Sequence, residues 1–539
     1  MFDVLNEEWI PVVMTDGSTK EYGLLDLFEN ANEIKDITDP SPLVRYGIMR
    51  LLIAFVTDVF RPKTVKDMGQ LLEARCFDIG KIKKYIADCK VEMGCNCFDL
   101  FDKSFPFLQT AYDSLYDKEK SVANIFNEIP SGNNHTHFLH LPENEHAYCP
   151  AVCIRALCAV NVFALAMVQE YPSGINNTPP WFVLIKKENM FESILVNTLC
   201  EKQIENSEMR KEMYYPPVAW RDKTKIIPKK VVPLTSYLRG LTWTARRICL
   251  IPDAESGTCT FSGKKSEILI RKIWFSQGWN SNDKGSSDSG NKWIDPHVGY
   301  TRVNKKNKEE IKSIKPSAED SAWRDLAGIA FGDVSKPLTV FQYINNKQLR
   351  KNEGVRKMEL ELFSLSTDNA KVCEWFNETF SLRFDVIEND EKSREIKLII
   401  QSIEEAAAIL KRKLSVVFVN LFKNKSKGKK NMSERYNLIS QAQVNFFSRM
   451  REYFFDTFIP ALCEVNIENN DWRIDLHNET SKKLVSTANA VFVKFSQRLG
   501  SDSATIVASV EAEKWLGIEL SSLLNTDMKP NSIKNKGGS

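Results

Sequence analysis

The sequence has no apolar stretch long enough to cross a membrane. Its longest apolar run, at 157–168, is interrupted by Asn161, whereas a membrane-spanning helix needs roughly 20 consecutive apolar residues. The first residues include Asp3, Glu7 and Glu8, where a secretory signal would have basic residues followed by an apolar core. These absences predict a cytoplasmic protein without a membrane partner.

A disulfide framework and the common catalytic motifs are also missing. Twelve cysteines are spread over 539 residues, so we expect most of them to be reduced and buried. The chain contains no phosphate-binding loop of the G-x-x-x-x-G-K-[ST] type, no G-x-S-x-G turn and no H-E-x-x-H helix. The sequence therefore does not indicate the enzyme classes that depend on these motifs.

Net charge is low as well, at +3, which argues against a protein that simply coats nucleic acid. The charges are unevenly distributed, however. Residues 1–170 hold 16 basic and 25 acidic side chains, and the remainder holds 57 and 45. An acidic front and a basic rear suit a protein that meets nucleic acid along part of its surface. Ordinary variation in surface charge is the alternative.

Short segments with strand-like spacing of apolar residues are mixed with segments of helical spacing, which predicts one irregular α+β domain over residues 1–385. Residues 5–13 have the pattern of a strand that leads into a hairpin turn at Asp16–Gly17. The residues that follow Pro42, up to Phe60, have the pattern of an apolar helix. Further strand patterns follow at 243–251 and 267–275, and a Ser-, Asn- and Gly-rich loop is expected at 276–292.

The C-terminal part changes character, because Gly and Pro become rare and apolar residues recur at helical spacing. Short connections favour antiparallel neighbours, so we predict a four-helix bundle over residues 386–528. Residues 529–539 are polar and are expected to be disordered. The four predicted helices are 393–422, 433–465, 471–499 and 504–524.

One cluster of histidines and cysteines could hold a metal. Zinc favours imidazole and thiolate ligands, and Glu143 or Glu145 could serve as a base beside it. This pattern leaves a metal-dependent nuclease or hydrolase as an alternative function. The spacings match no standard zinc finger, and loop hydrogen bonds together with helix packing explain the same residues. The cluster consists of His135, His137, His140, His146, Cys149 and Cys153.

Asp295, Pro296 and His297 form a second candidate. An Asp and a His so close together suggest a metal site or an acid–base pair. No second histidine or acidic cluster completes such a site. We therefore favour a structural Asp–His hydrogen bond beside the large side chain of Trp293.

Lysine-rich loops form the third group, at 223–230, 305–315, 347–357 and 423–430. Such loops can neutralise phosphates without reading base sequence, although a solvated loop is the alternative. The last loop joins two predicted bundle helices. Its candidate phosphate-binding residues are Lys423, Lys425, Lys427, Lys429 and Lys430.

Several short motifs stand in a fixed order along most of residues 1–375. They are 2–12, 21–28, 50–55, 105–109, 189–197, 217–220, 238–243, 293–298, 323–325 and 367–372. This ordered set resembles the CasA family, the large subunit of the type I-E CRISPR surveillance complex Cascade. The resemblance implies a binding subunit without catalytic residues or cofactors. It also implies four kinds of partner: a guide RNA, double-stranded target DNA, the backbone, small and guide-end subunits of Cascade, and a helicase–nuclease.

The resemblance further implies that the protein reads a protospacer-adjacent motif (PAM) from the minor groove and wedges the duplex open. The family's glycine-rich loop matches a segment here that has a single Gly, and its wedge usually carries Gln where this chain has Asn369. A loop before the cysteine-containing helix would dock the 5′ end of the guide RNA. The implied DNA-binding residues are Ser173, Gly174, Ile175, Asn176, Lys284, Asp368, Asn369 and Lys371, and the guide-docking residues are His137, Phe138 and His140.

Some members of the family hold a structural zinc with two C-x-x-C pairs. The matching positions here are Cys149 and Val152, then Cys259 and Ser262. Because a tetrahedral structural site needs four ligands, we expect this protein to bind no metal.

Overall fold

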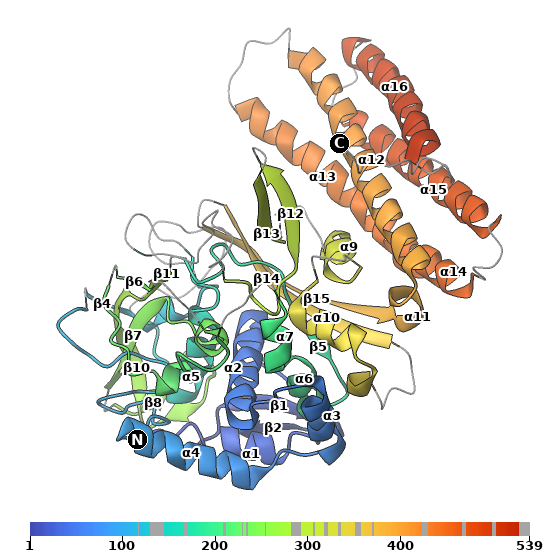
Figure 1. The fold of residues 1–539 in the computed structure, drawn as a ribbon. Coiled ribbons are helices and arrows are strands. Elements are labelled where there is room, and N and C mark those ends of the chain that lie inside the picture. Colours follow the sequence, from blue (N-terminus) through green and yellow to red (C-terminus); the bar gives the residue numbers. More distant parts are fainter. Residues whose placement is uncertain are drawn as a thin grey trace. The chain divides into compact units, whose positions relative to one another are not determined.

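The computed structural model divides the chain into two compact units (Figure 1). One contains Met1–Ala318 and Gly332–Ser381, and the other contains Glu319–Phe331 and Leu382–Ser539. The structure describes the chain except for residues 117, 130–144, 166–170, 172, 208–211, 229, 233–235, 254, 282–292, 306–307, 317–321, 332–335, 351–356, 369–370, 423–429, 466–470, 499–502 and 528–539.

The first unit opens with a small antiparallel sheet of strand order β2-β1-β3. The predicted hairpin turn is confirmed, and Gly17 has the positive φ of 87° that its turn requires. The predicted strand begins later than expected, at Ile10, because residues 4–7 form a turn that packs on the start of α1. The elements are β1 (Ile10–Met14), β2 (Thr19–Tyr22), β3 (Ile34–Ile37) and α1 (Leu24–Glu29).

Helix α2 (Pro42–Phe60) is the centre of this unit, and of its residues only Arg45 is not buried. Ser41 caps its N-terminus by accepting a hydrogen bond from the Val44 N–H, and Pro42 stands in the first turn, where no amide donor is needed. A Cβ at Gly47 would lie 2.7 Å from the Cys158 carbonyl. Glycine therefore lets α2 cross helix α5 (Pro150–Val160) at close range.

Two three-stranded sheets make up most of the remaining β-structure, with orders β4-β10-β7 and β15-β14-β5. The two strands predicted near 243–251 and 267–275 are confirmed as the antiparallel pair β7 and β10. Their strands are β4 (Lys118–Ser121), β5 (Phe182–Lys186), β7 (Arg246–Asp253), β10 (Leu269–Gln277), β14 (Lys357–Asp368) and β15 (Lys371–Arg383). Two-stranded ribbons are β6 (Val231–Val232) with β11 (Asn280–Ser281), β8 (Gly257–Thr258) with β9 (Lys265–Ser266), and β12 (Tyr300–Lys305) with β13 (Lys308–Ser313).

Shorter helices cover these sheets and α2. They are α3 (Val65–Ala74), α4 (Ile79–Met93), η1 (Val122–Ile125), α6 (Met190–Val196), α7 (Glu201–Glu205), η3 (Ala219–Arg221), α8 (Tyr237–Leu241), α10 (Leu338–Asn345) and η5 (Lys347–Arg350). Across the described part of the chain, no helix combines the length and the apolar character that a bilayer crossing requires.

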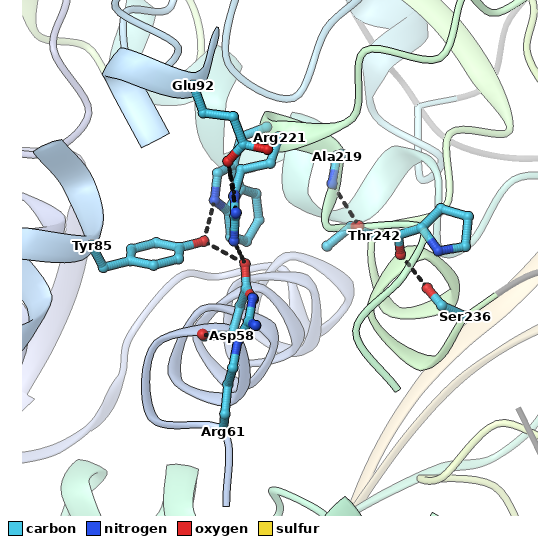
Figure 2. A network of polar contacts seen from close by, with 10 residues as sticks. Asp58, Arg61, Tyr85, Glu92, Ala219, Arg221, Ser236 and Thr242 are labelled. Atoms are coloured by element: carbon cyan, nitrogen blue, oxygen red, sulfur yellow. Dashed lines mark hydrogen bonds and ion pairs between the residues drawn. The ribbon is translucent and has the colours of Figure 1, made fainter. Parts of the chain in front are cut away.

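Asp58, near the end of α2, ties two of these shorter helices to α2 (Figure 2). Its carboxylate, whose side chain is 0% exposed, accepts hydrogen bonds from Tyr85 Oη at 2.8 Å and Arg221 Nη1 at 2.8 Å, and from Arg61 Nη2 at 2.7 Å. Arg221 also pairs with Glu92, at 2.6 Å. Asp58 therefore fixes α4 and η3 against α2 with several partners at once.

The second unit is a helical bundle, as predicted. Helices α12 (Asp390–Phe422), α13 (Lys430–Tyr453), α15 (Asp471–Ser496) and α16 (Ser503–Asp527) pack on one another. The helical spacing predicted from residues 396–410 is confirmed, because Ile396, Ile399 and Leu410 are all fully buried.

The second predicted bundle helix is interrupted, however. A π-helical turn, η6 (Phe454–Phe458), separates α13 from α14 (Ile459–Glu464). Pro460 lacks an amide donor and its ring displaces the carbonyl four residues earlier, which breaks the α-helical ladder at this point.

Residues 319–331 also belong to the bundle unit, together with α11 (Phe384–Ile387). They contain η4 (Ala322–Asp325) and α9 (Leu326–Ile329). Arg324 forms an ion pair with Glu404 of α12 and lies 3.8 Å from the centre of the Phe447 ring. The sequence analysis did not foresee this segment as part of the bundle.

Candidate nucleic-acid interface

The loop of Ser173–Asn177 is folded tightly against its own unit. The Gly174 N–H donates to the Ala164 carbonyl at 2.7 Å, and a β-bridge joins Gly174 to Asn177. A Cβ at Gly174 would lie 3.1 Å from the Asn161 carbonyl oxygen, so this glycine is needed for close packing. Ile175 is 6% exposed, and Ser173 Oγ bonds Asn177 Oδ1 at 3.3 Å.

Asn176 connects this loop to the Asp295–Pro296–His297 motif. Its Nδ2 donates to Asp295 Oδ2 at 2.8 Å. Asp295 is completely buried and forms an ion pair with Arg50 of α2, with 2.8 Å between Arg50 Nη2 and Asp295 Oδ2. Burial is the largest single effect and raises the pKa of Asp295, but the Arg50 charge and the hydrogen bonds from Arg50 and Asn176 together hold that pKa below its ordinary value. The pair is therefore charged at neutral pH.

His297 is structural, as expected, but its bonding differs from the prediction. Asp295 Oδ1 accepts from the backbone N–H of His297 at 3.1 Å. The imidazole instead contacts Tyr46 Oη through Nδ1 at 3.3 Å and the Asn197 carbonyl through Nε2 at 3.1 Å. Burial lowers the pKa of His297 to about 4, so the neutral ring donates through Nε2–H and accepts at Nδ1.

Trp293 packs on helix α8, and it explains the glycine there. A Cβ at Gly240 would lie 2.2 Å from the Trp293 ring. The Trp293 side chain is 2% exposed, so the segment before Asp295 is held in place by apolar packing.

The residues on either side of the predicted wedge lie in two neighbouring strands. Strand β14 ends at Asp368 and strand β15 begins at Lys371, and the two are neighbours in one sheet. Asn369 itself lies outside the described residues.

Several other predicted site residues also lie outside the described part of the chain. They are His135, His137, Phe138, His140, Lys284, Lys423, Lys425, Lys427 and Lys429. Lys430 is the first residue of α13.

The two cysteines aligned with the family's zinc site lie close together. Cys149 is the N-cap of α5, and Cys259 lies in the loop between β8 and β9. Cys149 Sγ is 3.9 Å from Ser262 Oγ, and the Ser262 N–H donates to Cys259 Sγ at 3.5 Å. A hydrogen bond from Cys149 lowers the pKa of Cys259, while the same contact raises the pKa of Cys149.

Among the described residues, no further metal ligand accompanies this pair. Within the residues that the structure describes, no group of three or more His, Cys, Asp or Glu side chains is placed to hold a metal. His146, from the predicted cluster, bonds Tyr148 Oη through Nδ1 at 2.8 Å.

The sequence analysis overlooked Arg50, Tyr46 and Asn197, which complete the buried network. Arg50 did leave a signal. An arginine inside a largely apolar helix is almost never buried without a partner. That signal predicts a buried acid, although it does not say which one.

By its fold, the protein belongs to the class of α+β proteins that have a C-terminal helical bundle. Within that class, residues 3–489 match the family model of CRISPR-associated protein Cse1. The chain therefore belongs to the Cse1 (CasA) family.

Individual relatives agree with this assignment. A CasA/Cse1 protein of Thermus thermophilus is 25% identical over 390 residues, which is 71% of each chain. The Cse1 structure of Thermobifida fusca superposes with a TM-score of 0.70 at 14% identity over 97% of this chain and 98% of that one. A chain of a CRISPR RNA-guided surveillance complex superposes with a TM-score of 0.67 at 15% identity over 96% of this chain and 99% of that one.

Proposed function

We propose that this protein is the large subunit of a type I-E CRISPR Cascade complex. The observation that carries the proposal is the family match over residues 3–489. The fold is shared over nearly the whole chain with a subunit of an RNA-guided surveillance complex, which supports assembly with a guide RNA and with the backbone, small and guide-end subunits. The protein then acts in the cytoplasm as a binding subunit, without catalysis of its own.

In this role the protein recognises the PAM in double-stranded DNA and opens the duplex. The loop of Ser173–Asn176 and Lys284 face the minor groove, where the pattern of donors and acceptors is degenerate and several PAM sequences are tolerated. Asn369 stands in the sequence between Asp368 and Lys371 and enters the base stack as a wedge. The neighbouring strands β14 and β15 support this role, because they hold the chain on both sides of the wedge.

The remaining predicted residues assist the same process. His137, Phe138 and His140 dock the guide RNA, and Phe138 stacks on an unpaired base. Lys423, Lys425, Lys427, Lys429 and Lys430 neutralise DNA phosphates without reading sequence. The opened complex then recruits the helicase–nuclease, which cuts the DNA.

Replacing the wedge tests this function. Separating a base step costs a few kcal/mol, so Asn369→Ala in the assembled complex should slow R-loop formation by roughly tenfold or more without preventing assembly. Stopped-flow fluorescence of a labelled duplex measures the rate. Asn345→Ala, an exposed asparagine at the end of α10, is the control. R-loop kinetics that match the control would contradict the wedge assignment.

A further inference from the structure

The loop that the proposed function assigns to the PAM has its side chains turned towards its own unit. Gly174 has carbonyl oxygens of Asn161 and Val162 within 3.2 Å of the place where a Cβ would stand. Ile175 is 6% exposed. Neither residue offers a polar side-chain group to a base edge, so the shape of the loop backbone must matter more than its side chains.

The side-chain amide of Asn176 is hydrogen-bonded to a buried carboxylate. Its Nδ2 donates to Asp295 Oδ2 at 2.8 Å, across 119 residues of sequence. Asp295 also accepts from the His297 N–H, and its own N–H donates to Tyr300 Oη at 2.7 Å. The carboxylate that receives Asn176 is thus held from several directions.

Arg50 completes the anchor from within α2. Its Nε donates to the Leu241 carbonyl at 2.9 Å, and its Nη2 donates to the Gly240 carbonyl at 3.1 Å. Its Nη1 bonds Tyr46 Oη at 3.0 Å and Asp295 Oδ1 at 3.2 Å. The Arg50 and Asp295 side chains are 2% and 0% exposed. An ion pair sealed in this way holds its members in one geometry.

We infer that Asn176 is a positioning residue, which fixes the PAM-reading loop to the buried Arg50–Asp295 pair rather than contacting a base. The inference rests on the proposed function of the loop and names the residues that set its specificity. It also explains why an amide is needed at 176, since a carboxylate there would face Asp295 with a like charge. Helix α2, through Arg50, thereby determines the conformation in which the loop meets DNA.

The test changes the amide at position 176 alone and then exchanges it with the carboxylate at position 295. Asn176→Asp places two carboxylates together and should free the loop. Asn176→Ala removes the bond without adding charge, which keeps the test valid if the aspartate variant fails to assemble. The double variant Asn176→Asp with Asp295→Asn restores an amide–carboxylate pair and should recover part of the effect. Recovery is partial because Asp295→Asn also removes the carboxylate that is the counter-ion of the buried Arg50.

Asn177→Asp is the charge-matched control. Asn177 lies in the same loop, but its Oδ1 accepts from Ser173 Oγ, and a carboxylate can accept this bond equally well. Asp also tolerates its left-handed backbone, at φ 62°. The control adds the same charge to the loop while leaving the bond to Asp295 intact.

Two measurements are needed. Hydrogen exchange of the isolated chain measures how readily the loop opens. Discrimination between PAMs is measured by offering the assembled complex a pool of duplexes that carry a randomised segment beside the protospacer and sequencing those it selects. We expect Asn176→Asp to speed exchange at 173–177 and to lower discrimination, each by roughly tenfold, which is what one charge-assisted hydrogen bond provides. Affinity for duplexes without a PAM should fall in Asn176→Asp only as far as it does in Asn177→Asp, because both add one negative charge, and should be unchanged in Asn176→Ala. Asn177→Asp should weaken all duplexes alike and leave their ratio intact.

The possible failures are distinguishable. If Asn176→Asp or Asn176→Ala keeps the wild-type exchange or the wild-type discrimination, the inference is wrong. Equal loss of discrimination in Asn177→Asp would show that charge, not the bond to Asp295, is responsible, and would also overturn it. A wild-type complex that ignores the randomised segment would instead overturn the proposed function, and the inference with it.

Discussion

Helix α2 carries two buried charges, Arg50 and Asp58, which are satisfied in different ways. Asp58 receives three donors, and two of the side chains around it reach solvent, because Arg61 is 47% exposed and Glu92 is 44% exposed. Arg50 has one counter-ion, Asp295, and both are sealed from water. The C-terminal end of the helix thus holds a carboxylate with two arginine partners, whereas the middle of the helix holds a single ion pair.

The two arrangements serve different purposes: one stabilises the fold, and the other selects a single conformation. A network with several partners loses only part of its stabilisation when one partner is removed. A single buried pair contributes little net stability, because desolvation offsets attraction, but breaking it leaves an uncompensated charge. The Arg50–Asp295 pair is therefore better suited to fixing one arrangement, that of the loop at Asn176, than to stabilising the fold.

Breaking the single pair should give the largest effect. Arg50→Met leaves Asp295 buried without a counter-ion and should lower the free energy of unfolding by about 3–5 kcal/mol. Denaturant unfolding of the purified chain measures this loss. Adding Asp295→Leu to the same chain should return part of the stability, since it removes the orphaned charge. A single variant as stable as the wild type would contradict the assigned burial of the pair.

Acid should weaken the structure around the Arg50–Asp295 pair through His297. Its folded pKa is lowered from 6.5 to about 4 by burial, against the attraction of Asp295. Between these values the unfolded state binds more protons than the folded state. The contribution of His297 is therefore complete above pH 6.5 and is lost as the pH falls towards 4, by about 3 kcal/mol in all.

The variant His297→Gln isolates this effect, because the other titrating groups are common to both proteins. Its stability should fall less steeply than that of the wild type between pH 6.5 and 4. Parallel curves for the two proteins would mean that the imidazole is not held neutral in the fold.

Local patterns predicted the elements but not these networks. Helical spacing identified α2 and the bundle, and alternation identified β7 and β10, because each signal lies within one element. Arg50 and Asp295 are 245 residues apart, so no window of sequence pairs them. The segment of 319–331 joins the bundle through contacts such as Arg324 with Glu404, and local spacing likewise could not foresee it. The loop at 173–177 was found by family resemblance alone, and its bond to Asp295 only by structure.

Removing the charge of Asp58, which has several partners, should destabilise the protein less than removing the charge of Arg50. Asp58→Asn keeps the shape of the side chain, and Arg221 retains its ion pair with Glu92. We expect a loss of about 1–3 kcal/mol in unfolding free energy, as for a buried group that loses part of its hydrogen bonding. Denaturant unfolding beside Arg50→Met measures the contrast. If Asp58→Asn lowers the unfolding free energy as much as Arg50→Met or more, the Asp58 network is no more tolerant than the Arg50–Asp295 pair.

The thiol pair of Cys149, at the start of α5, and Cys259, in the loop between β8 and β9, should show the smallest effect. A hydrogen bond from Cys149 lowers the pKa of Cys259. The other two positions of the family's zinc site hold Val152, which is apolar, and Ser262, whose hydroxyl is a poor zinc ligand. A structural zinc site needs four good ligands, so neither zinc nor a chelator should shift the melting temperature of the wild-type protein.

The variant Val152→Cys with Ser262→Cys supplies the two missing thiolates. It should bind about one zinc per chain and become sensitive to chelators, because metal binding to a structural site adds directly to folding stability. Elemental analysis of both proteins distinguishes the cases. Stoichiometric zinc in the wild type would mean that a further ligand completes the site. A double variant without zinc would mean that position 152 does not face the two original cysteines.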